Sequence, residues 1–337
     1  MLKDKLLDLK NNKQVWVVTG AAGFIGSNLV EALLGLNQKV VGLDNFSTGS
    51  KENLDNLLSN QREKEFTFIE GDITSYNTCK KVVKGATYVL HQAALGSIPR
   101  SINDPLNSNQ SNVTGFLNML TASKDEDVKR FVFAGSSSTY GDHKQLPKKE
   151  HVIGKPLSPY AITKYVNELY AETFSLHYGF KTIGLRYFNV FGRRQRTDGA
   201  YAAVIPTWIK AILENKEVLI YGDGETSRDF CYIDNVIQAN ILAALTTEEN
   251  SLNQIYNIAL NDQTSLLDLY KLISGAISEI DPSINIPDPI YKDFRAGDVA
   301  HSKADITKAK ELLKYDPTHR VKEGIKETVT WYMKNLR

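Results

Sequence analysis

The segment from Val15 to Gly26 reads VWVVTGAAGFIG, a run of apolar and β-branched residues that stops at three glycines. Gly20, Gly23 and Gly26 recur at every third position. Glycine tolerates positive φ in a tight turn, and it lets backbone N–H groups approach a phosphate where a Cβ would block them. The pattern predicts a strand, a turn and the start of a helix. It is typical of a loop that binds the pyrophosphate of a dinucleotide, although an ordinary glycine turn remains an alternative.

Asp44 follows the next predicted strand, residues 39–43. A carboxylate at the end of that strand can accept hydrogen bonds from the ribose hydroxyls of adenosine and would repel a 2′-phosphate, which favours NAD over NADP. The alternative is that Asp44 opens a turn, because the stretch DNFSTGS is rich in turn-forming residues. Asp72 ends a third strand and is expected at the adenine edge, or else it caps the following loop.

Further apolar strands are predicted at residues 66–69, 86–92, 130–134 and 181–187, with helical patterns between them, including residues 105–123. Such alternation predicts an α/β fold, a Rossmann-like doubly wound parallel sheet with helices on both faces and a site at the carboxyl ends of the strands. We expect residues 1–190 to form an NAD-binding domain. Residues 191–337 are expected to be mainly a smaller mixed α/β substrate domain, with some later segments crossing back to the first.

Composition excludes several classes of protein. Lys and Arg number 40 against 39 Asp and Glu, which argues against a general nucleic-acid partner. Cys79 and Cys231 lack the spacing of a metal site or a disulfide framework, which predicts no metal and favours the reducing cytoplasm. No apolar run is long enough to span a membrane. Residues 1–13 mix charges with leucines, which predicts an amphipathic helix or a frayed tail and not a signal peptide.

Two strings after the fifth predicted strand indicate catalysis. The first is SSSTYG at residues 136–141, and the second is SPYAITK at residues 158–164. Ser158 and Pro159 suit a helix start, so Tyr160 and Lys164 share one helix face. A nearby cation favours the phenolate and makes a tyrosine usable as a base near neutral pH. The same tyrosine–lysine spacing occurs at residues 76 and 80. What distinguishes Tyr160 and Lys164 is the serine cluster at the end of the preceding strand, followed by a helix start, downstream of the glycine loop.

Several long strings occur in a fixed order: TGAAGFIG, SSSTYG, SPYAITK, RYFNVFG, DGETSRDF and RAGD. With them the chain resembles the extended short-chain dehydrogenase/reductase family from about Gln14 to near the C-terminus. Within that family it is most similar to bacterial UDP-N-acetylglucosamine 4-epimerases of surface-polysaccharide synthesis. The resemblance implies a tightly held NAD, a UDP-sugar substrate, a transient 4-keto sugar, and a homodimer formed through residues 105–123 and 158–178.

The resemblance, together with the loops described above, gives the expected site residues. The catalytic residues are Ser136, Tyr160 and Lys164. Expected at the cofactor are Gly20, Gly23, Phe24, Ile25, Asp44, Asn45, Ser47, Thr48, Gly49, Asp72, Ile73, Gln92, Ala93, Ala94, Tyr160, Lys164 and Phe188. Expected at the UDP-sugar are Gly96, Ser97, Ser137, Ser138, Asn189, Gln195, Ala203, Val204, Tyr221, Arg228, Arg295, Asp298 and Ser302.

Two positions bear on the reaction and the substrate. Nucleotide-sugar dehydratases and decarboxylases of this fold need an acid directly after the catalytic hydroxyl, and here Ser137 and Ser138 stand there. Ser302 stands where galactose-specific relatives carry tyrosine, so the resemblance implies room for an N-acetyl group. Arg196 and Ala300 depart from the family pattern and leave the fine substrate preference open. A dehydratase or decarboxylase and an inactive NAD-binding protein are the alternatives.

Overall fold

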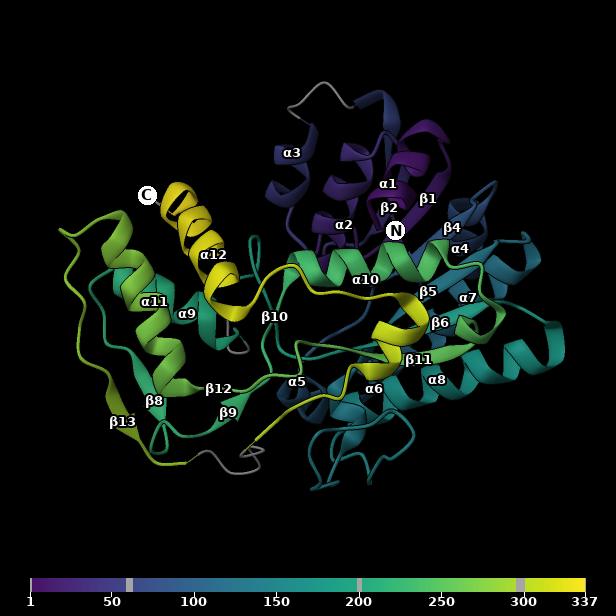
Figure 1. The fold of residues 1–337 in the computed structure, drawn as a ribbon. Coiled ribbons are helices and arrows are strands. Elements are labelled where there is room, and N and C mark those ends of the chain that lie inside the picture. The colour runs from purple at the N-terminus through teal and green to yellow at the C-terminus, as the bar shows by residue number, and fades with distance from the viewer. Residues whose placement is uncertain (1, 59–62, 199–201, 295–300, 337) are drawn as a thin grey trace.

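A parallel sheet of seven strands forms the centre of the molecule (Figure 1). The computed structural model describes residues 2–58, 63–198, 202–294 and 301–336. The strand order is β11-β6-β5-β4-β1-β2-β3, and every neighbouring pair is parallel. The strands are β1 (Val15–Thr19), β2 (Lys39–Asp44), β3 (Phe66–Glu70), β4 (Tyr88–His91), β5 (Arg130–Ser136), β6 (Thr182–Tyr187) and β11 (Gln254–Ile258). The predicted doubly wound sheet is confirmed.

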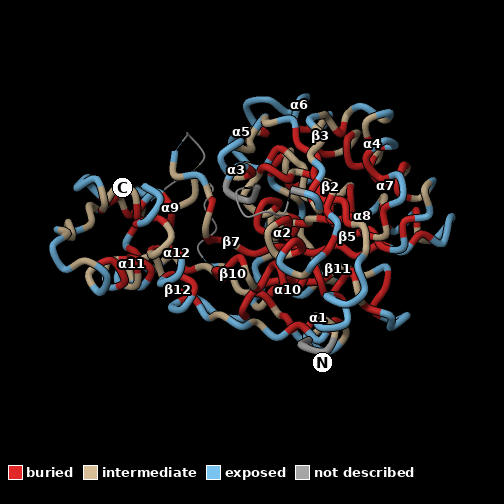
Figure 2. The backbone as a smooth tube through the Cα atoms, turned by 90° about the horizontal axis from the view of Figure 1, so that it is seen from above, coloured by how far each residue is buried: buried red, intermediate tan, exposed pale blue. Residues whose placement is uncertain are grey.

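Helices cover both faces of this sheet, and each face has its own hydrophobic core. On one face α2 (Phe24–Gly35) and α10 (Ile233–Leu245) pack over Val18 and Leu90. On the other face α4 (Tyr76–Val83), α7 (Gly115–Asp125) and α8 (Pro159–Tyr178) pack over Val17 and Val89. Alternate residues of β1 thus face opposite cores, as expected for a strand buried on both sides. The buried backbone concentrates in this larger part of the molecule (Figure 2).

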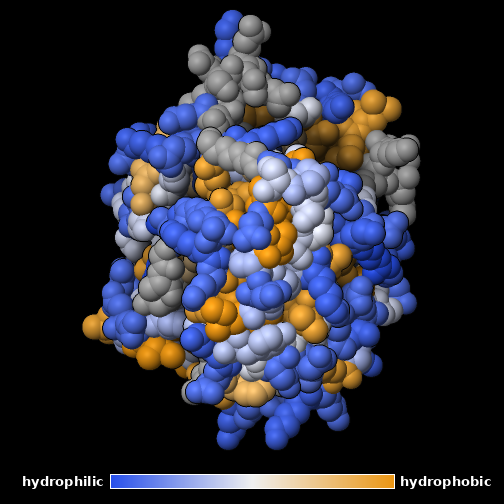
Figure 3. Space-filling model, turned by 90° about the vertical axis from the view of Figure 1, so that its left-hand side faces the viewer, coloured by the Kyte–Doolittle hydropathy of each residue, from blue (hydrophilic) through white to orange (hydrophobic). Residues whose placement is uncertain are grey.

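A smaller lobe lies beside the sheet and comes from the second half of the chain (Figure 1). It contains α9 (Val204–Leu213), α11 (Leu266–Ile280) and α12 (Val321–Asn335), together with β8 (Leu219–Tyr221), which pairs with β13 (Ile290–Lys292). Seen from this side, hydrophobic side chains form a band within a largely hydrophilic face (Figure 3). The second half of the chain is not confined to this lobe, because α10 and β11 belong to the main sheet layer.

The remaining elements connect these layers. They are α1 (Leu2–Asn11), α3 (Glu52–Leu58), η1 (Glu63–Glu65), α5 (Ile98–Asn103), α6 (Pro105–Asn109), η2 (Gln110–Thr114), η3 (Ser137–Tyr140), β7 (Val190–Phe191), β9 (Ser227–Arg228), β10 (Cys231–Tyr232), η4 (Glu249–Ser251), β12 (Thr264–Ser265) and η5 (Ala309–Leu313). The helix expected over residues 105–123 is interrupted by the wider π turn η2. Among the described residues no helix has the length and apolarity needed to cross a bilayer.

Candidate active site

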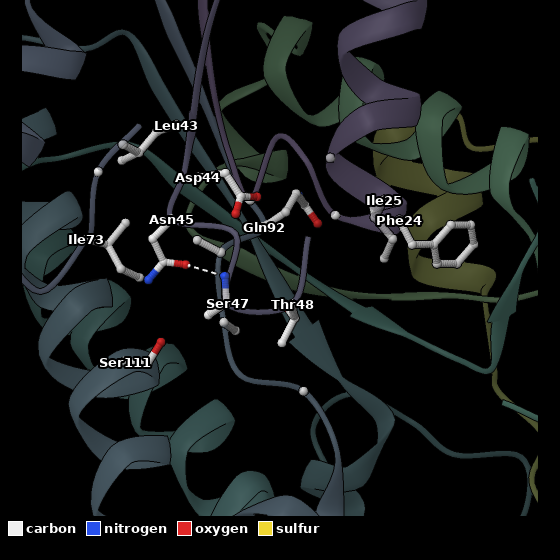
Figure 4. A pocket seen from close by; sticks show the side chains of 17 residues that line it. Phe24, Ile25, Leu43, Asp44, Asn45, Ser47, Thr48, Ile73, Gln92 and Ser111 are labelled. Atoms are coloured by element: carbon white, nitrogen blue, oxygen red, sulfur yellow. Dashed lines mark hydrogen bonds between the residues drawn. The ribbon is translucent and has the colours of Figure 1, made fainter. Parts of the chain in front are cut away.

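A pocket of about 290 Å³ opens at the carboxyl ends of β1, β2 and β4 (Figure 4). Its lining residues come from the glycine loop, the loops after β2 and β4, the turn after β3, and η2. They are Gly20, Gly23, Phe24, Ile25, Gly26, Leu43, Asp44, Asn45, Ser47, Thr48, Gly71, Ile73, Gln92, Ala93, Ala94, Gly96 and Ser111. The sequence predicted a site at the carboxyl ends of the parallel strands, and the structure has a pocket there.

The glycine loop forms the floor of this pocket, and the backbone around Gly20 and Gly26 leaves no room for a side chain at either position. Gly20 has a φ of +67°, and a Cβ there would lie 2.9 Å from the backbone nitrogen of Ala93. A Cβ on Gly26 would lie 2.0 Å from the carbonyl oxygen of Gly20, closer than any contact permits. The first turn of α2 consequently packs directly against the loop. Its N-terminus faces the pocket, and this arrangement suits the pyrophosphate of a dinucleotide.

Asp44 closes the pocket at the end of β2. Its carboxylate accepts hydrogen bonds from the backbone N–H groups of Ala22, at 2.9 Å, and Phe46, at 2.8 Å. Burial raises the pKa of Asp44, and these backbone hydrogen bonds oppose the shift. The neighbouring Asn45 accepts from the N–H of Ser47 at 3.0 Å and donates to Asp72 at 2.7 Å (Figure 4). A preorganised carboxylate at this position can accept ribose hydroxyls.

Most residues expected at the cofactor line the pocket, and five do not. The lining ones are Gly20, Gly23, Phe24, Ile25, Asp44, Asn45, Ser47, Thr48, Ile73, Gln92, Ala93 and Ala94. Gly49 lies against Ala22 of the glycine loop, and Asp72 lies behind Asn45. Phe188 is fully buried, with its ring 5.9 Å from that of Tyr140. The other two, Tyr160 and Lys164, belong to the group that is also predicted to be catalytic. Leu43, Gly71 and Ser111 were not predicted, and Ser111 lies on the π turn that sequence periodicity does not distinguish from an α-helix.

A hydrogen-bond network behind the pocket fixes Gln92. The Gln92 side chain donates to the Asn240 oxygen at 3.2 Å and accepts from the Tyr187 hydroxyl at 3.2 Å. Asn240 also donates to the Tyr187 hydroxyl at 2.9 Å. Asn240 lies on α10, far along the chain from the glycine loop. The second half of the chain therefore holds a side chain that lines the pocket.

Ser136, Tyr160 and Lys164 meet at the end of β5 and the start of α8. Ser158 caps α8 by accepting from the N–H of Ala161, as predicted. Burial raises the pKa of the Tyr160 hydroxyl, and a hydrogen bond with Ser136 opposes the shift. The Lys164 ammonium lies 5.9 Å from the centre of the Tyr160 ring. The three side chains thus form one cluster that contains a serine hydroxyl, a phenol and a cation.

Lys164 is nearly fully buried, and its surroundings set its charge. Its ammonium donates to the carbonyl oxygen of Ala134 at 2.9 Å. Burial lowers the pKa of Lys164 to about 8, and the negative charge of Glu168 opposes the shift. Glu168 lies one turn further along α8, and its two carboxylate oxygens accept hydrogen bonds from Nε and Nη2 of Arg186, at 2.8 and 2.7 Å. Tyr160, Lys164 and Glu168 therefore share one face of α8.

Asn112 connects the pocket wall to this cluster. Its side chain accepts from the N–H of Leu95 at 2.7 Å and donates to the Leu95 carbonyl at 3.1 Å. It also donates to the Thr163 hydroxyl at 3.2 Å, and that hydroxyl donates to the carbonyl of Tyr160 at 2.8 Å. The backbone next to Gly96 is thereby held beside the catalytic helix. Nothing in the sequence pattern distinguished Asn112 from its polar neighbours.

The residues expected at the UDP-sugar lie around the catalytic cluster and toward the smaller lobe. Gly96 lines the pocket, and Ser97 has a strained φ of +101° at the start of α5. Ser138 hydrogen-bonds Ser136 at 2.8 Å, and Ser137 begins η3. The rest lie after β6: Asn189 before β7, Gln195 after it, Ala203 and Val204 at the start of α9, Tyr221 at the end of β8, Arg228 on β9, and Ser302 next to β9. Arg295 and Asp298 lie outside the described residues.

Two arginines that the sequence left unassigned hold the loop after β7 against the sheet layer. Arg194 is buried and pairs with Glu31 of α2 at 2.7 Å, while Arg193 pairs with Asp234 of α10 at 2.8 Å. Asp234 also lies close to His319 and Glu327, a grouping with metal-ligating atoms. Arg193 already donates to the Asp234 carboxylate, and the Tyr232 hydroxyl donates to the Glu327 carboxylate. We therefore assign this cluster to the contact between the two lobes.

The fold and the pocket define a dinucleotide-binding enzyme of the Rossmann type. Residues 16–259 match the NAD dependent epimerase/dehydratase family, and the chain belongs to that family. It is 39% identical to the structure of a UDP-N-acetylglucosamine 4-epimerase from Methanobrevibacter ruminantium in complex with UDP-N-acetylmuramic acid, with a TM-score of 0.88 and coverage of 96% and 99% of the two chains. It is 36% identical to UDP-glucose 4-epimerase of Thermotoga maritima with UDP-glucose, with a TM-score of 0.86 and coverage of 96% and 100%.

A further relative is the UDP-glucuronate 4-epimerase of Thermodesulfobacterium geofontis, which is 34% identical over 95% of this chain and 97% of its own length. Within the family the chain thus groups with NAD-dependent UDP-sugar 4-epimerases. Related structures have been solved with NAD bound. NAD is the cofactor, and the glycine floor and Asp44 fit it. The predicted resemblance to this family is confirmed.

Proposed function

We propose that this chain is a UDP-hexose 4-epimerase that interconverts UDP-N-acetylglucosamine and UDP-N-acetylgalactosamine, and that it also accepts UDP-glucose and UDP-galactose. The observation that carries the proposal is the cluster of Ser136, Tyr160 and Lys164 beside a pocket suited to NAD. We place the reaction in the cytoplasm, as a step that supplies surface-polysaccharide synthesis.

In this proposal NAD supplies the hydride chemistry at C4 of the sugar. Tyr160 removes the proton of the O4 hydroxyl and returns it after the 4-keto sugar has turned its other face. Ser136 hydrogen-bonds the same oxygen, and the buried charge of Lys164 stabilises the Tyr160 phenolate. The Glu168–Arg186 pair holds the helix face that carries both residues.

Epimerisation is favoured over elimination by the residues after Ser136. Ser137 and Ser138 begin η3, and neither can move a proton at C5 or C6 as a carboxylic acid would. Epimerisation needs only the tyrosine and space for the ketose to rotate. The presence of both Tyr160 and Lys164 argues against an inactive NAD-binding protein.

The preference for N-acetylated sugars rests on Ser302. Its backbone N–H donates to the carbonyl of Ser227 at 3.0 Å, so it lies beside β9, which carries Arg228. A serine at this position occupies much less volume than a tyrosine and leaves space at C2 of the sugar. We propose that Arg228 with Arg295 neutralises the diphosphate, and that Asn189, Tyr221 and Asp298 hold the remainder of the UDP. Residues 1–190 then serve mainly NAD, and residues 191–337 mainly the UDP-sugar.

We further propose a homodimer through α6, α7 and α8. α5 and α6 pack against α8, and their outer surfaces leave large apolar side chains exposed. Those on α5 and α6 are Ile98, Ile102 and Leu106, and those on α8 are Ile162, Leu169 and Leu176, with Leu157 just before α8. Large apolar side chains exposed on neighbouring helices are typical of a self-complementary interface.

A side-by-side assay of UDP-glucose, UDP-galactose, UDP-N-acetylglucosamine and UDP-glucuronate tests the proposal. We expect the NAD-loaded protein to convert the first three, and failure to convert UDP-N-acetylglucosamine would refute the proposal. In Ser302→Tyr we expect activity on the N-acetylated sugars to fall about tenfold or more relative to UDP-glucose. Ser302→Ala is the matched control. An equal loss on all sugars would show that Ser302 does not set the size of the pocket.

A further inference from the structure

Asp229 is a fully buried carboxylate that the proposed reaction does not use. It accepts three backbone hydrogen bonds from segments far apart in the sequence. The donors are the N–H groups of Leu260 at 2.9 Å, Ala304 at 3.1 Å and Asp262 at 3.2 Å. Burial raises the pKa of Asp229 to about 6, and these three hydrogen bonds oppose the shift. A buried carboxylate with three such partners fixes the relative positions of the backbones that it joins.

The joined segments also contact one another beside β9, near the boundary between the two lobes (Figure 1). β12, which follows the Leu260 turn, pairs antiparallel with β9. The Ser227 hydroxyl hydrogen-bonds His301 at 2.8 Å and accepts from the Gln263 side chain at 3.1 Å. The carbonyl of Asp229 accepts from the Asn189 side chain at 3.2 Å. Asp229 therefore lies where four stretches of chain meet.

Three of these stretches carry residues that we assign to the UDP-sugar. Arg228 immediately precedes Asp229, Ser302 lies two positions before Ala304, and Asn189 contacts Asp229 directly. Arg228, Ser302 and Asn189 lie on separate segments, so their mutual distances depend on a common anchor. Asp229 follows Arg228 directly and bonds the other two stretches: its carbonyl accepts from Asn189, and its carboxylate accepts from Ala304.

We propose that Asp229 is a positioning residue for the substrate: together with the adjacent Ser227–His301 hydrogen bond, it holds strand β9 with its diphosphate-binding arginine, the Asn189 loop and the Ser302 segment in binding register. This inference rests on the proposed function, because that function assigns UDP-sugar to these strands. Asp229 itself faces backbone amides and not the ligand. Its loss is therefore expected to loosen UDP-sugar binding while the NAD pocket, formed by other strands, stays intact.

Asp229→Asn tests the inference most directly. An asparagine has nearly the same size, but it presents one oxygen and one NH₂ group to three N–H donors, so at least one donor loses its partner. We expect the Kd for UDP, measured by titration calorimetry on NAD-loaded protein, to rise about tenfold or more. KM for the UDP-sugar should rise in parallel. kcat at saturation and the NAD content of the purified protein should stay near those of the wild type.

Asp262→Asn is the matched control, because Asp262 is exposed and its contact with Asp229 uses the backbone. It should leave the Kd unchanged. If wild-type protein neither binds UDP nor converts UDP-sugars, the proposed function fails. If the wild type does both and Asp229→Asn binds UDP normally, the positioning role is wrong. A fall in kcat and NAD content without a change in Kd would likewise overturn it.

A second variant applies if Asp229→Asn does not fold. His301 is exposed, so His301→Ala removes the bond to Ser227 without opening the core. We expect this variant to raise KM for the UDP-sugar at least about threefold, as expected when a single hydrogen bond is lost. An unchanged KM in that variant would overturn the proposal.

Discussion

At the scale of single residues, the protonation states in the proposed catalytic cluster depend on what surrounds each ionisable group. Burial raises the pKa of Tyr160 and lowers that of Lys164, so each shift favours the neutral form. Ser136 and Glu168 act in the opposite direction. The sequence predicted that Tyr160 and Lys164 share a helix face, because their spacing lies in a helix that Ser158 caps. It did not identify Glu168, because an acidic residue on a helix face is most often solvent-exposed, and only the fold brings Arg186 to it.

Tyr160→Phe removes the proposed base and little else. We expect turnover of UDP-sugars to fall about a thousandfold, while NAD remains bound, because the glycine loop and Asp44 are untouched. Turnover is measured by coupled assay, and NAD content by absorbance after release. Tyr165→Phe, on the same helix, is the control and should retain activity. Normal turnover in Tyr160→Phe would remove Tyr160 from the mechanism.

Glu168→Gln tests the electrostatic support of Lys164. The charge of Glu168 raises the pKa of Lys164, which burial has lowered to about 8. Removing that charge lowers the pKa of Lys164 again, so the ammonium loses its proton at a lower pH. We expect the alkaline decline of kcat to move to lower pH than in the wild type. The pH profile of kcat between pH 6 and 10 measures this on variants that stay folded in thermal unfolding. Glu172→Gln, exposed on the same helix, should leave the profile in place.

At the scale of elements, the join between β1 and α2 is the most constrained part of the pocket. Apolar runs and glycine spacing were sufficient to predict this join, because both are local properties of the chain. The π turn η2 was not predicted, since its extra backbone residue leaves no sequence signature and depends on packing against α8. Some later segments were expected to cross back to the first domain, but β11 and α10 were not identified as those segments, because their apolar runs do not specify which layer they join.

Gly26→Ala is expected to disrupt that join. The new Cβ would overlap the carbonyl of Gly20, so α2 must move away from the loop. We expect a loss of stability of about 2 kcal/mol and a clear fall in NAD content, measured by urea unfolding and by absorbance. Gly275→Ala, in α11 with open space around its Cβ, is the control and should stabilise the protein by about 0.5 to 1 kcal/mol. Full NAD content in Gly26→Ala would show that the close packing is not needed to hold the cofactor.

At the scale of the whole molecule, we propose that the sheet and the smaller lobe provide separate surfaces to NAD and to the UDP-sugar, and that α6, α7 and α8 provide a third to a second copy of the chain. Fold class and strand succession were predictable, because alternating apolar runs determine a parallel sheet. The contact between the lobes was not, because Arg193 and Arg194 find Asp234 and Glu31 only once the chain has folded. Local sequence patterns contain no such long-range pairings.

The double variant Leu106→Glu, Leu169→Glu tests the proposed homodimer. Leu106 and Leu169 are 83% and 43% exposed, so glutamates are tolerated in the monomer but repel across a symmetric interface. We expect light scattering to show twice the chain mass of 37.7 kDa for the wild type and the single mass for the variant. Leu7→Glu, exposed on α1, should leave the dimer intact. A dimer that persists in the double variant would place the interface elsewhere.

The return of the chain from the smaller lobe to β11 has a consequence for biosynthesis. Gln92 in the pocket is held by Asn240 of α10, and β6 obtains its outer neighbour only when β11 arrives. A nascent chain that has emerged only as far as β6 contains the whole glycine loop, but it lacks both Asn240, which holds Gln92, and β11, which pairs with β6. The residues that line the pocket lie between Gly20 and Ser111, but these two supports are in place only after residue 258 has left the ribosome. We therefore expect a chain truncated before α10 to hold NAD less firmly than the full chain.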